Sequence, residues 1–364
     1  MQARGSGYMI GVIGGFGDIG SRVVDYISRY SEHYIRIGGR NRHEISNKYF
    51  NKISFHQVDI EDKASLSKYI EGCDVVINCT GISREKTTAL QEVIVEKSVN
   101  YISLDMYDWS EYIRRFSGIK NVVVDCCGSI PGLAEVLMIY MCNSFKKIDK
   151  LRFYYGALGK FTITAAKDYL LGLDNTTTKS MAYLKNGKVS IYPNLDKLEE
   201  ELPFLESNFK IFPYIDEGTL YVAEKFHIQE GVWYMAFTGD RTLKVLEDTK
   251  KSAKKLSIAS ELDCNELGSF AGYLIEVTGD ESEDNITKTL YLRFKHPSEL
   301  TAFVASMSAL AVCEGILRPG IYPLYKMAEV KEYVEYLNRF EDVFRIFVAN
   351  GNKNIFMEIE ENEL

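Results

Sequence analysis

Short apolar runs alternate with helical patterns over roughly the first 130 residues, and no other feature of the chain constrains its fold as strongly. The run Asp74-Val-Val-Ile-Asn-Cys79 has an unbroken apolar middle, as expected for a strand that is buried on both faces of a parallel sheet. Strands are predicted at residues 8–13, 34–37, 53–58, 74–79, 101–104 and 121–125, with helices opening near Asp18 and at 64–70 and 87–97. This order predicts an α/β fold with a doubly wound, Rossmann-type parallel sheet.

After Pro131 the pattern changes to strands with few strong helices between them. Strands are expected at residues 151–157, 188–192, 219–225 and 232–238, followed by a hairpin of 273–278 with 287–294, and helices at 243–259 and 297–317. The acidic, proline-punctuated stretch 193–213 is interpreted as a surface excursion. The second part of the chain is therefore predicted to be a mixed α+β domain with a mainly antiparallel sheet.

A glycine-rich turn of the form GxGxxG lies between the first predicted strand and the first predicted helix. The first glycine is expected to make the tight turn, the second to let a pyrophosphate approach, and the third to let helix and strand pack closely. Phosphates would then lie at the helix N-terminus, where unpaired amides favour an anion. The predicted phosphate-binding residues are Gly15, Phe16, Gly17, Asp18, Ile19 and Gly20.

The residues after the second strand indicate which dinucleotide is bound. An acidic residue about 20 positions past the turn would accept from the ribose hydroxyl of NAD, whereas this chain has Arg40, with Asn41 and Arg42 beside it. A guanidinium suits the 2′-phosphate of NADP, so we expect NADP, with NAD as the alternative. Three further cofactor-binding residues are expected where later strands end, namely Asp59, Thr80 and Gly81.

Charge and residue patterns exclude several other classes of protein. Acidic residues outnumber basic ones by 51 to 43, giving a net charge of −8, which argues against a nucleic-acid surface. Polar residues interrupt the apolar run 300–317, which predicts a helix buried under the sheet or against a second subunit, in a homodimer, rather than a membrane span. The glycine-rich N-terminus is unlike a signal peptide, so a cytoplasmic protein is expected. Seven cysteines without a CxxC pair and five scattered histidines predict no metal site.

Six short segments appear in the order in which one known family carries them. They are Gly11-Val-Ile-Gly-Gly-Phe-Gly17, Asp74-Val-Val-Ile-Asn78, Asn100-Tyr-Ile-Ser103, Gly128-Ser-Ile-Pro-Gly-Leu133, Tyr154-Tyr-Gly-Ala-Leu158 and Phe226-His-Ile-Gln-Glu230. Through them the chain resembles the saccharopine dehydrogenase-like family, and within it the glutamate-forming saccharopine reductases.

The resemblance implies a domain plan and a reaction. It implies an NADP-binding Rossmann domain in residues 1–128, an inserted substrate-binding and dimerisation domain in 129–296, and C-terminal helices in 297–364 that return to the Rossmann domain. It also implies hydride transfer from NADPH to an imine of a small-molecule substrate, or the reverse oxidation of a secondary amine. The reductases carry an acidic residue where this chain has Ile130, so a substrate other than saccharopine is expected.

Three residues are predicted from the resemblance to be catalytic. Tyr101 matches a tyrosine of the family, and Tyr155 stands where the reductases have a cysteine. Lys167 corresponds to a basic residue that would hold a substrate carboxylate, provided that one residue is inserted. The alternatives are that Tyr101 is a hydrogen-bonded core tyrosine and that Lys167 is exposed at the start of a helix. The chemistry needs only one donor that polarises or protonates the imine nitrogen.

Three alternative functions follow from the same pattern. A short-chain dehydrogenase would use a YxxxK motif, but the matches that begin at Tyr221, Tyr291 and Tyr322 come late in the chain, the first two in predicted strands. An enoyl reductase would deliver hydride to a polarised C=C bond with similar geometry. A sensor would bind NADP without consuming it.

Overall fold

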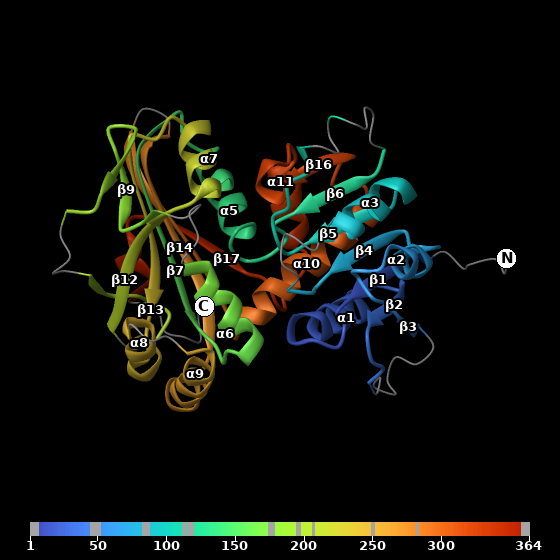
Figure 1. The fold of residues 1–364 in the computed structure, drawn as a ribbon. Coiled ribbons are helices and arrows are strands. Elements are labelled where there is room, and N and C mark those ends of the chain that lie inside the picture. Colours follow the sequence, from blue (N-terminus) through green and yellow to red (C-terminus); the bar gives the residue numbers. More distant parts are fainter. Residues whose placement is uncertain are drawn as a thin grey trace. The chain divides into compact units, whose positions relative to one another are not determined.

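A computed structural model describes residues 7–43, 52–81, 88–110, 114, 120–173, 179–193, 198–205, 208–248, 252–281 and 284–357. The chain divides into two compact units (Figure 1). Unit 1 comprises Met1–Leu133 and Ser298–Leu337, and unit 2 comprises Ala134–Pro297 and Asn338–Leu364. The sequence assigned all of residues 297–364 to the Rossmann side, whereas the last part joins unit 2 because β17 (Ile346–Asn350) pairs with β15 (Asn285–Phe294).

Unit 1 is built on a parallel sheet of seven strands in the order β16-β6-β5-β4-β1-β2-β3. Its strands are β1 (Met9–Ile13), β2 (Tyr34–Gly39), β3 (Ile53–Gln57), β4 (Val75–Asn78), β5 (Asn100–Ser103), β6 (Val122–Asp125) and β16 (Gly320–Pro323). Every residue of β4 and β6 is buried, as the unbroken apolar runs predict. The doubly wound parallel sheet is confirmed. The seventh strand, β16, was not predicted because its four half-buried residues show no strand pattern.

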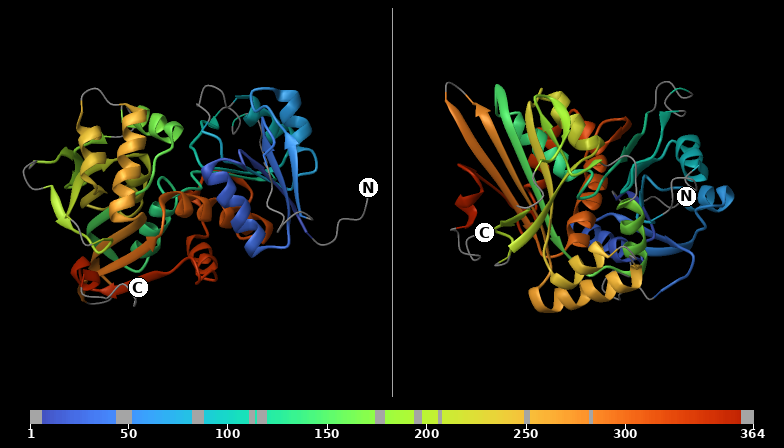
Figure 2. Two further views of the ribbon diagram at one scale, coloured as in Figure 1. Left: turned by 90° about the horizontal axis from the view of Figure 1, so that it is seen from below. Right: turned by 60° about the vertical axis from the view of Figure 1, so that its left-hand side comes forward.

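The helices of unit 1 are α1 (Asp18–Tyr30), α2 (Lys63–Ile70), α3 (Thr88–Lys97), α10 (Pro297–Cys313) and α11 (Val330–Leu337), with the short 3₁₀ helix η3 (Leu324–Lys326). Twelve residues of α10 are buried. On one side Phe303 packs edge-on against Tyr26 of α1, and on the other Ser308 hydrogen-bonds Tyr333 of α11. Figure 2 shows the orange ribbon of α10 beside the dark blue ribbon of α1. The long apolar helix is therefore buried inside unit 1. Among the described helices, none combines the length and apolarity that crossing a membrane requires.

Unit 2 is built on a ten-stranded mixed sheet with the main order β10-β9-β13-β7-β14-β15-β17, while β12 pairs with β13, β11 and β8. Besides β15 and β17, its strands are β7 (Lys147–Leu158), β8 (Lys179–Ser180), β9 (Ala182–Lys185), β10 (Lys188–Ile191), β11 (Glu199–Glu201), β12 (Asn208–Ile215), β13 (Glu230–Phe237) and β14 (Phe270–Asp280). The one departure from the expected antiparallel arrangement is that β13 and β7 pair in parallel.

The helices of unit 2 are α5 (Leu133–Cys142), α6 (Ile163–Leu173), α7 (Glu217–Lys225), α8 (Asp240–Glu247) and α9 (Ala253–Leu267), with the 3₁₀ helix η4 (Lys353–Met357). On the sheet, Trp233 of β13 donates its indole N–H to the Met138 sulfur of α5, 3.2 Å away. Helix α5 therefore covers the sheet face that carries Trp233. The opposite face contributes a second core that contains Tyr154, Phe204 and Tyr291.

Three sequence predictions for unit 2 were wrong. Residues 219–225 form helix α7 rather than a strand, because Asp216 caps the helix in a box with Thr219, whose amide lies 2.8 Å from the Asp216 carboxylate. The helix expected at 243–259 is two helices, α8 and α9. The excursion expected at 193–213 contains β11 and most of β12, while residues 194–197 and 206–207 lie outside the described residues.

Candidate functional site

The glycine-rich turn joins β1 to α1 with very little room for side chains. Gly14 has a left-handed φ of +78° and donates its amide to the Gly38 carbonyl of β2 at 2.8 Å. A Cβ atom on Gly20 would lie 2.2 Å from the Gly14 carbonyl oxygen, so the third glycine of the motif permits close helix–strand packing as predicted. Gly15 lies inside this turn, because the Gly17 amide donates to the Gly14 carbonyl at 2.9 Å, and the left-handed residue at the start of the turn is Gly14.

The first turn of α1 offers backbone amides to an anion. Gly17 is the N-cap and, among the described residues, no side chain caps it. The Asp18 carboxylate is held by Arg22 at 3.3 Å and by the Ser298 hydroxyl at 2.5 Å. The amides at the start of a helix have no intrahelical partners and carry its positive dipole end. The backbone N–H groups of this turn can therefore donate hydrogen bonds to a pyrophosphate, and the Asp18 side chain takes no part in that binding.

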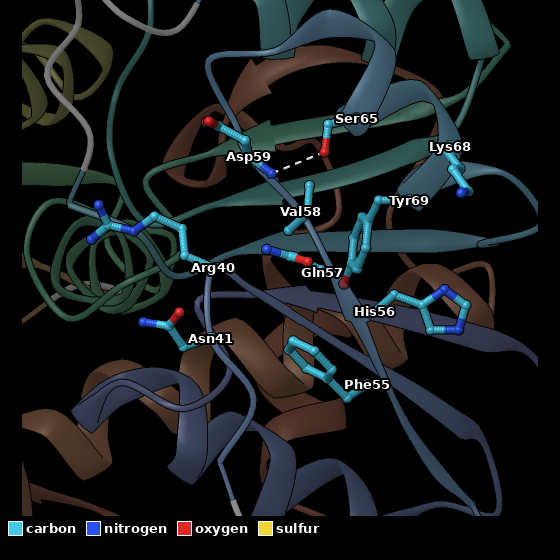
Figure 3. Close-up of a pocket in the computed structure, with 10 residues that line it drawn as sticks. All are labelled: Arg40, Asn41, Phe55, His56, Gln57, Val58, Asp59, Ser65, Lys68 and Tyr69. Carbon is cyan, nitrogen blue, oxygen red and sulfur yellow. Dashed lines mark hydrogen bonds between the residues drawn. The ribbon is translucent and has the colours of Figure 1, made fainter.

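A pocket of about 650 Å³ lies beyond the ends of β2 and β3 (Figure 3). Its lining residues are Arg40, Asn41, Phe55, His56, Gln57, Val58, Asp59, Ser65, Lys68 and Tyr69. Figure 3 shows the Arg40 and Lys68 side chains well apart, and they come from different elements, the end of β2 and helix α2. The glycine turn lies beside this pocket, because the ring of the lining residue Phe55 packs 5.7 Å from that of Phe16.

Charge and hydrogen bonding define the chemistry of this pocket. Arg40 and Lys68 supply two cations, while burial and the nearby charges of Arg36 and Lys68 lower the pKa of His56. The Asp59 amide donates to the Ser65 hydroxyl at 3.0 Å, which ties the end of β3 to α2. The predicted residues Arg40, Asn41 and Asp59 thus share one pocket. The sequence pattern did not identify Lys68 because it lies on a helix whose direction was not known.

The loop after β4 is fixed by Asn78, a buried residue of the strand end. Its side-chain oxygen accepts from the Thr80 amide at 3.1 Å and from the Thr80 hydroxyl at 2.6 Å. Its NH₂ group donates to the hydroxyls of Tyr101 and Tyr107, at 3.2 and 3.0 Å. A Cβ on Gly14 would be 3.0 Å from the Thr80 methyl group, so the loop of Thr80 and Gly81 lies beside the glycine turn.

Tyr101 is fully buried in the core of unit 1. Its ring packs edge-on against Trp109 at 6.1 Å, and burial raises the pKa of its hydroxyl well above the ordinary value. This placement agrees with the alternative of a hydrogen-bonded core tyrosine, with the Asn78 side chain as a partner, while a contact of Tyr101 with substrate stays a prediction. Tyr101 acts on the site by holding Asn78 and, through it, the Thr80 loop.

The other two predicted catalytic residues lie in unit 2. Tyr155 is a half-buried residue of β7, and its ring lies 5.7 Å from that of Tyr273 on β14. Burial raises the pKa of Tyr169 on α6, and the nearby Tyr155 hydroxyl raises it further. Lys167 is exposed on the same helix, about 200° around the axis from Tyr169. The exposure of Lys167 agrees with the alternative given for it, although Lys167 is the fifth residue of α6 and not its first, and its contact with a substrate carboxylate stays a prediction.

The motif used against a short-chain dehydrogenase also needs correction. Tyr221 and Lys225 lie in helix α7 rather than in a strand, with the Lys225 ammonium 5.9 Å from the centre of the Tyr221 ring. Helix α7 belongs to unit 2, whereas the glycine turn belongs to unit 1. All seven cysteines are free thiols, and the described residues contain no group of three potential metal-binding side chains.

Comparison with known proteins agrees with this geometry. Residues 10–120 match the family profile of the saccharopine dehydrogenase NADP binding domain. No curated protein sequence matches the chain. The fold superposes on apo saccharopine dehydrogenase (L-Glu forming) from Saccharomyces cerevisiae with a TM-score of 0.69 and 12% identity, covering 95% of this chain and 100% of that one.

Two other dehydrogenase structures superpose less closely. The diaminopimelate (DAP) dehydrogenase of C. glutamicum in complex with DAP has a TM-score of 0.45 and 13% identity, and covers 92% of this chain and 96% of that one. An engineered D-amino acid dehydrogenase bound to NADP+ has a TM-score of 0.47 and 15% identity, and covers 91% of this chain and 96% of that one.

The glycine turn, the uncapped start of α1 and the cationic pocket all lie within or beside the matched residues. They offer backbone amides to a pyrophosphate and a guanidinium to a further phosphate, which is the donor set that NADP requires. Residues 10–120, in unit 1, are therefore similar to the saccharopine dehydrogenase NADP binding domain, and unit 1 carries the NADP-binding site.

Proposed function

We propose that the protein reduces an imine with NADPH, or oxidises a secondary amine in the reverse direction, and that its substrate is not saccharopine. The observation that carries the proposal is the match of the whole chain, both units included, to the fold of a saccharopine dehydrogenase. A substrate other than saccharopine is favoured because Ile130 replaces an acidic residue of the reductases.

In this proposal unit 1 holds and orients the cofactor, which supplies the hydride when it is bound. The amides at the start of α1 bind the pyrophosphate, and Arg40 and Lys68 bind the adenosine end with its 2′-phosphate. The Asn78 side chain holds the Thr80 backbone beside the glycine turn, where the nicotinamide half of a dinucleotide would pass. These residues bind and orient, and none of them transfers a proton.

Unit 2 contributes the substrate-contacting groups in this proposal. Tyr155, half-buried on the sheet, is the proposed donor of a hydrogen bond to the substrate nitrogen. Lys167, exposed on α6, is proposed to meet a substrate carboxylate only if the substrate has one. A tyrosine is sufficient because reduction of an imine asks the protein for a single polarising donor near the nitrogen.

The proposal is tested by following NADPH absorbance with a panel of cyclic and acyclic imines, with enones, and with saccharopine and NADP+ in the oxidative direction. Consumption of NADPH with imines, and at most slow oxidation of saccharopine, supports the proposal. Turnover of enones alone would instead establish the enoyl reductase. Tight NADPH binding without turnover of any compound would establish a sensor.

The homodimer and the cytoplasmic location stay predictions. Light scattering of the purified protein would decide the first, with twice the monomer mass of 41.5 kDa expected and the monomer mass contradicting it. Fractionation of cells with an antibody against the chain would decide the second.

A further inference from the structure

One face of the unit 2 sheet carries a continuous set of aromatic residues. Strand register places Tyr214, Trp233, Phe153 and Ile275 side by side in one row, and Phe212, Met235, Tyr155 and Tyr273 in the neighbouring row. Residues two apart in a strand share a face, so both rows lie on the side that Trp233 presents to α5. We call these two rows the tyrosine face.

The tyrosine face is covered only in part. Tyr214, Trp233 and Tyr273 are buried, whereas Phe212, Met235 and Tyr155 remain half-buried. The partly open row therefore leaves aromatic and thioether surface within reach of a ligand. Aromatic rings in such a position bind apolar chains and the faces of cationic groups.

The hydroxyl of Tyr214 has an unmet hydrogen-bonding requirement. The residue is 7% exposed, and among the described residues no group lies within hydrogen-bonding distance of its oxygen. An unpaired buried hydroxyl is destabilising, so native structures rarely keep one without a reason. A bound ligand that hydrogen-bonds this oxygen would supply such a reason.

Two carboxylic acids surround the same hydroxyl. Glu135 of α5 is fully buried, and a Cβ on Gly218 at the start of α7 would lie 3.1 Å from the Glu135 carboxyl oxygen. Asp216 caps α7 two residues after Tyr214. Burial raises the pKa of Tyr214 well above the ordinary value, and the charges of Asp216 and Glu135 are the next largest causes. Both carboxyl groups therefore lie close enough to act on the unpaired hydroxyl, and a cation bound there would gain from either one in its charged form.

We infer that the tyrosine face binds a cationic amine, whose ammonium donates to the Tyr214 hydroxyl under the negative field of Glu135 and Asp216. The inference rests on the proposed function, because it names the substrate class of the same reaction: an amine-bearing compound rather than a dicarboxylate. An ammonium is favoured over a carboxylate because it gains from both acids and from the faces of Tyr155 and Tyr273.

The test is calorimetric titration of the full-length protein, saturated with NADP+, with cadaverine, pentanediol and glutarate, which share one carbon chain length. Cadaverine is expected to bind at least about tenfold more tightly than pentanediol, with glutarate weakest. Equal binding of the three, or preference for glutarate, would overturn the inference. Because binding is measured without turnover, the preference can fail while imine reduction stands, and imine reduction can fail while the preference stands.

Two variants and a control locate the effect. Tyr214→Phe keeps the ring and removes the unpaired hydroxyl, so cadaverine binding should weaken about tenfold while pentanediol binding changes little. Glu135→Gln, checked for native circular dichroism, should likewise weaken cadaverine binding alone. Tyr234→Phe is the matched control, since it removes a hydroxyl that pairs with Tyr192 at 3.1 Å on the opposite face of the same sheet. Loss of cadaverine binding in the control, or none in Tyr214→Phe, would contradict the assignment.

Discussion

The cofactor region of unit 1 and the tyrosine face of unit 2 are built in different ways. In unit 1 the site consists mainly of backbone: a left-handed Gly14, a Gly20 without room for a side chain, and the open amides of α1. In unit 2 the site consists of side chains such as Tyr155 and Tyr214, which the pairing of four strands, β12, β13, β7 and β14, brings together. Backbone sites leave a fixed spacing of glycines in the sequence, whereas side-chain sites depend on the register of strands far apart in the chain.

The largest effect is expected at Gly20, where a substitution tests most strongly whether the backbone of the turn forms the unit 1 site. Gly20→Ala places a Cβ 2.2 Å from the Gly14 carbonyl oxygen, which must push α1 away from the turn. We expect a stability loss of about 3 kcal/mol and no measurable NADPH binding. Gly39→Ala is the control, because its Cβ would meet no described atom closer than 3.7 Å. Calorimetry and thermal unfolding measure both; a fully active Gly20→Ala protein would contradict the account.

The next effect tests whether side chains matter in unit 1 as well. Arg40→Ala should weaken NADPH binding about a hundredfold and leave NADH binding nearly unchanged, since a bidentate guanidinium–phosphate pair contributes about 3 kcal/mol. Lys68→Ala should weaken NADPH binding about tenfold, and Arg42→Ala, outside the pocket lining, should have little effect. Equal losses for NADPH and NADH in Arg40→Ala would show that the guanidinium does not read the 2′-phosphate.

More of the unit 1 site than of the unit 2 site could be predicted from the sequence, because a backbone site leaves a local pattern and a side-chain site does not. The parallel sheet, the glycine turn, and the shared pocket of Arg40 and Asp59 followed from spacing along short stretches of chain. Tyr214 was missed because β12 begins in a proline-punctuated, acidic stretch whose strand character comes from pairing with β13 and β11. Helix α7 was missed because its apolar residues form one short run, at 220–223, which is also typical of a buried strand, and the capping box at Asp216 was not recognised.

A smaller effect separates a positioning role from a catalytic role for Tyr101. Tyr101→Phe removes one partner of the Asn78 side chain, so NADPH affinity should fall about fivefold and stability by about 1 kcal/mol, with an unchanged pH profile of kcat. Tyr333→Phe is matched, because it removes another buried hydroxyl of unit 1, paired with the Ser308 hydroxyl at 2.7 Å and outside the pocket lining. A fall in kcat of a hundredfold or more at unchanged KM would identify Tyr101 as the proton donor instead.

The smallest effect concerns stability and compares two hydroxyls of unit 2. Tyr214→Phe removes a buried hydroxyl without a described partner, so the unliganded protein should gain about 1 kcal/mol. Tyr291→Phe removes a hydroxyl that donates to the Pro203 carbonyl at 3.0 Å, so it should lose about 1 kcal/mol. Urea unfolding gives both values. Destabilisation of similar size in the two variants would show that the Tyr214 hydroxyl is already satisfied without a ligand.

The central claim is that the backbone turn and Arg40 of unit 1 bind NADP. Its most direct test is parallel calorimetric titration of the purified protein with NADPH and NADH at one ionic strength. The account predicts saturable one-to-one binding of NADPH, at least about tenfold tighter than that of NADH. Absence of binding for both nucleotides, or tighter binding of NADH, would contradict it.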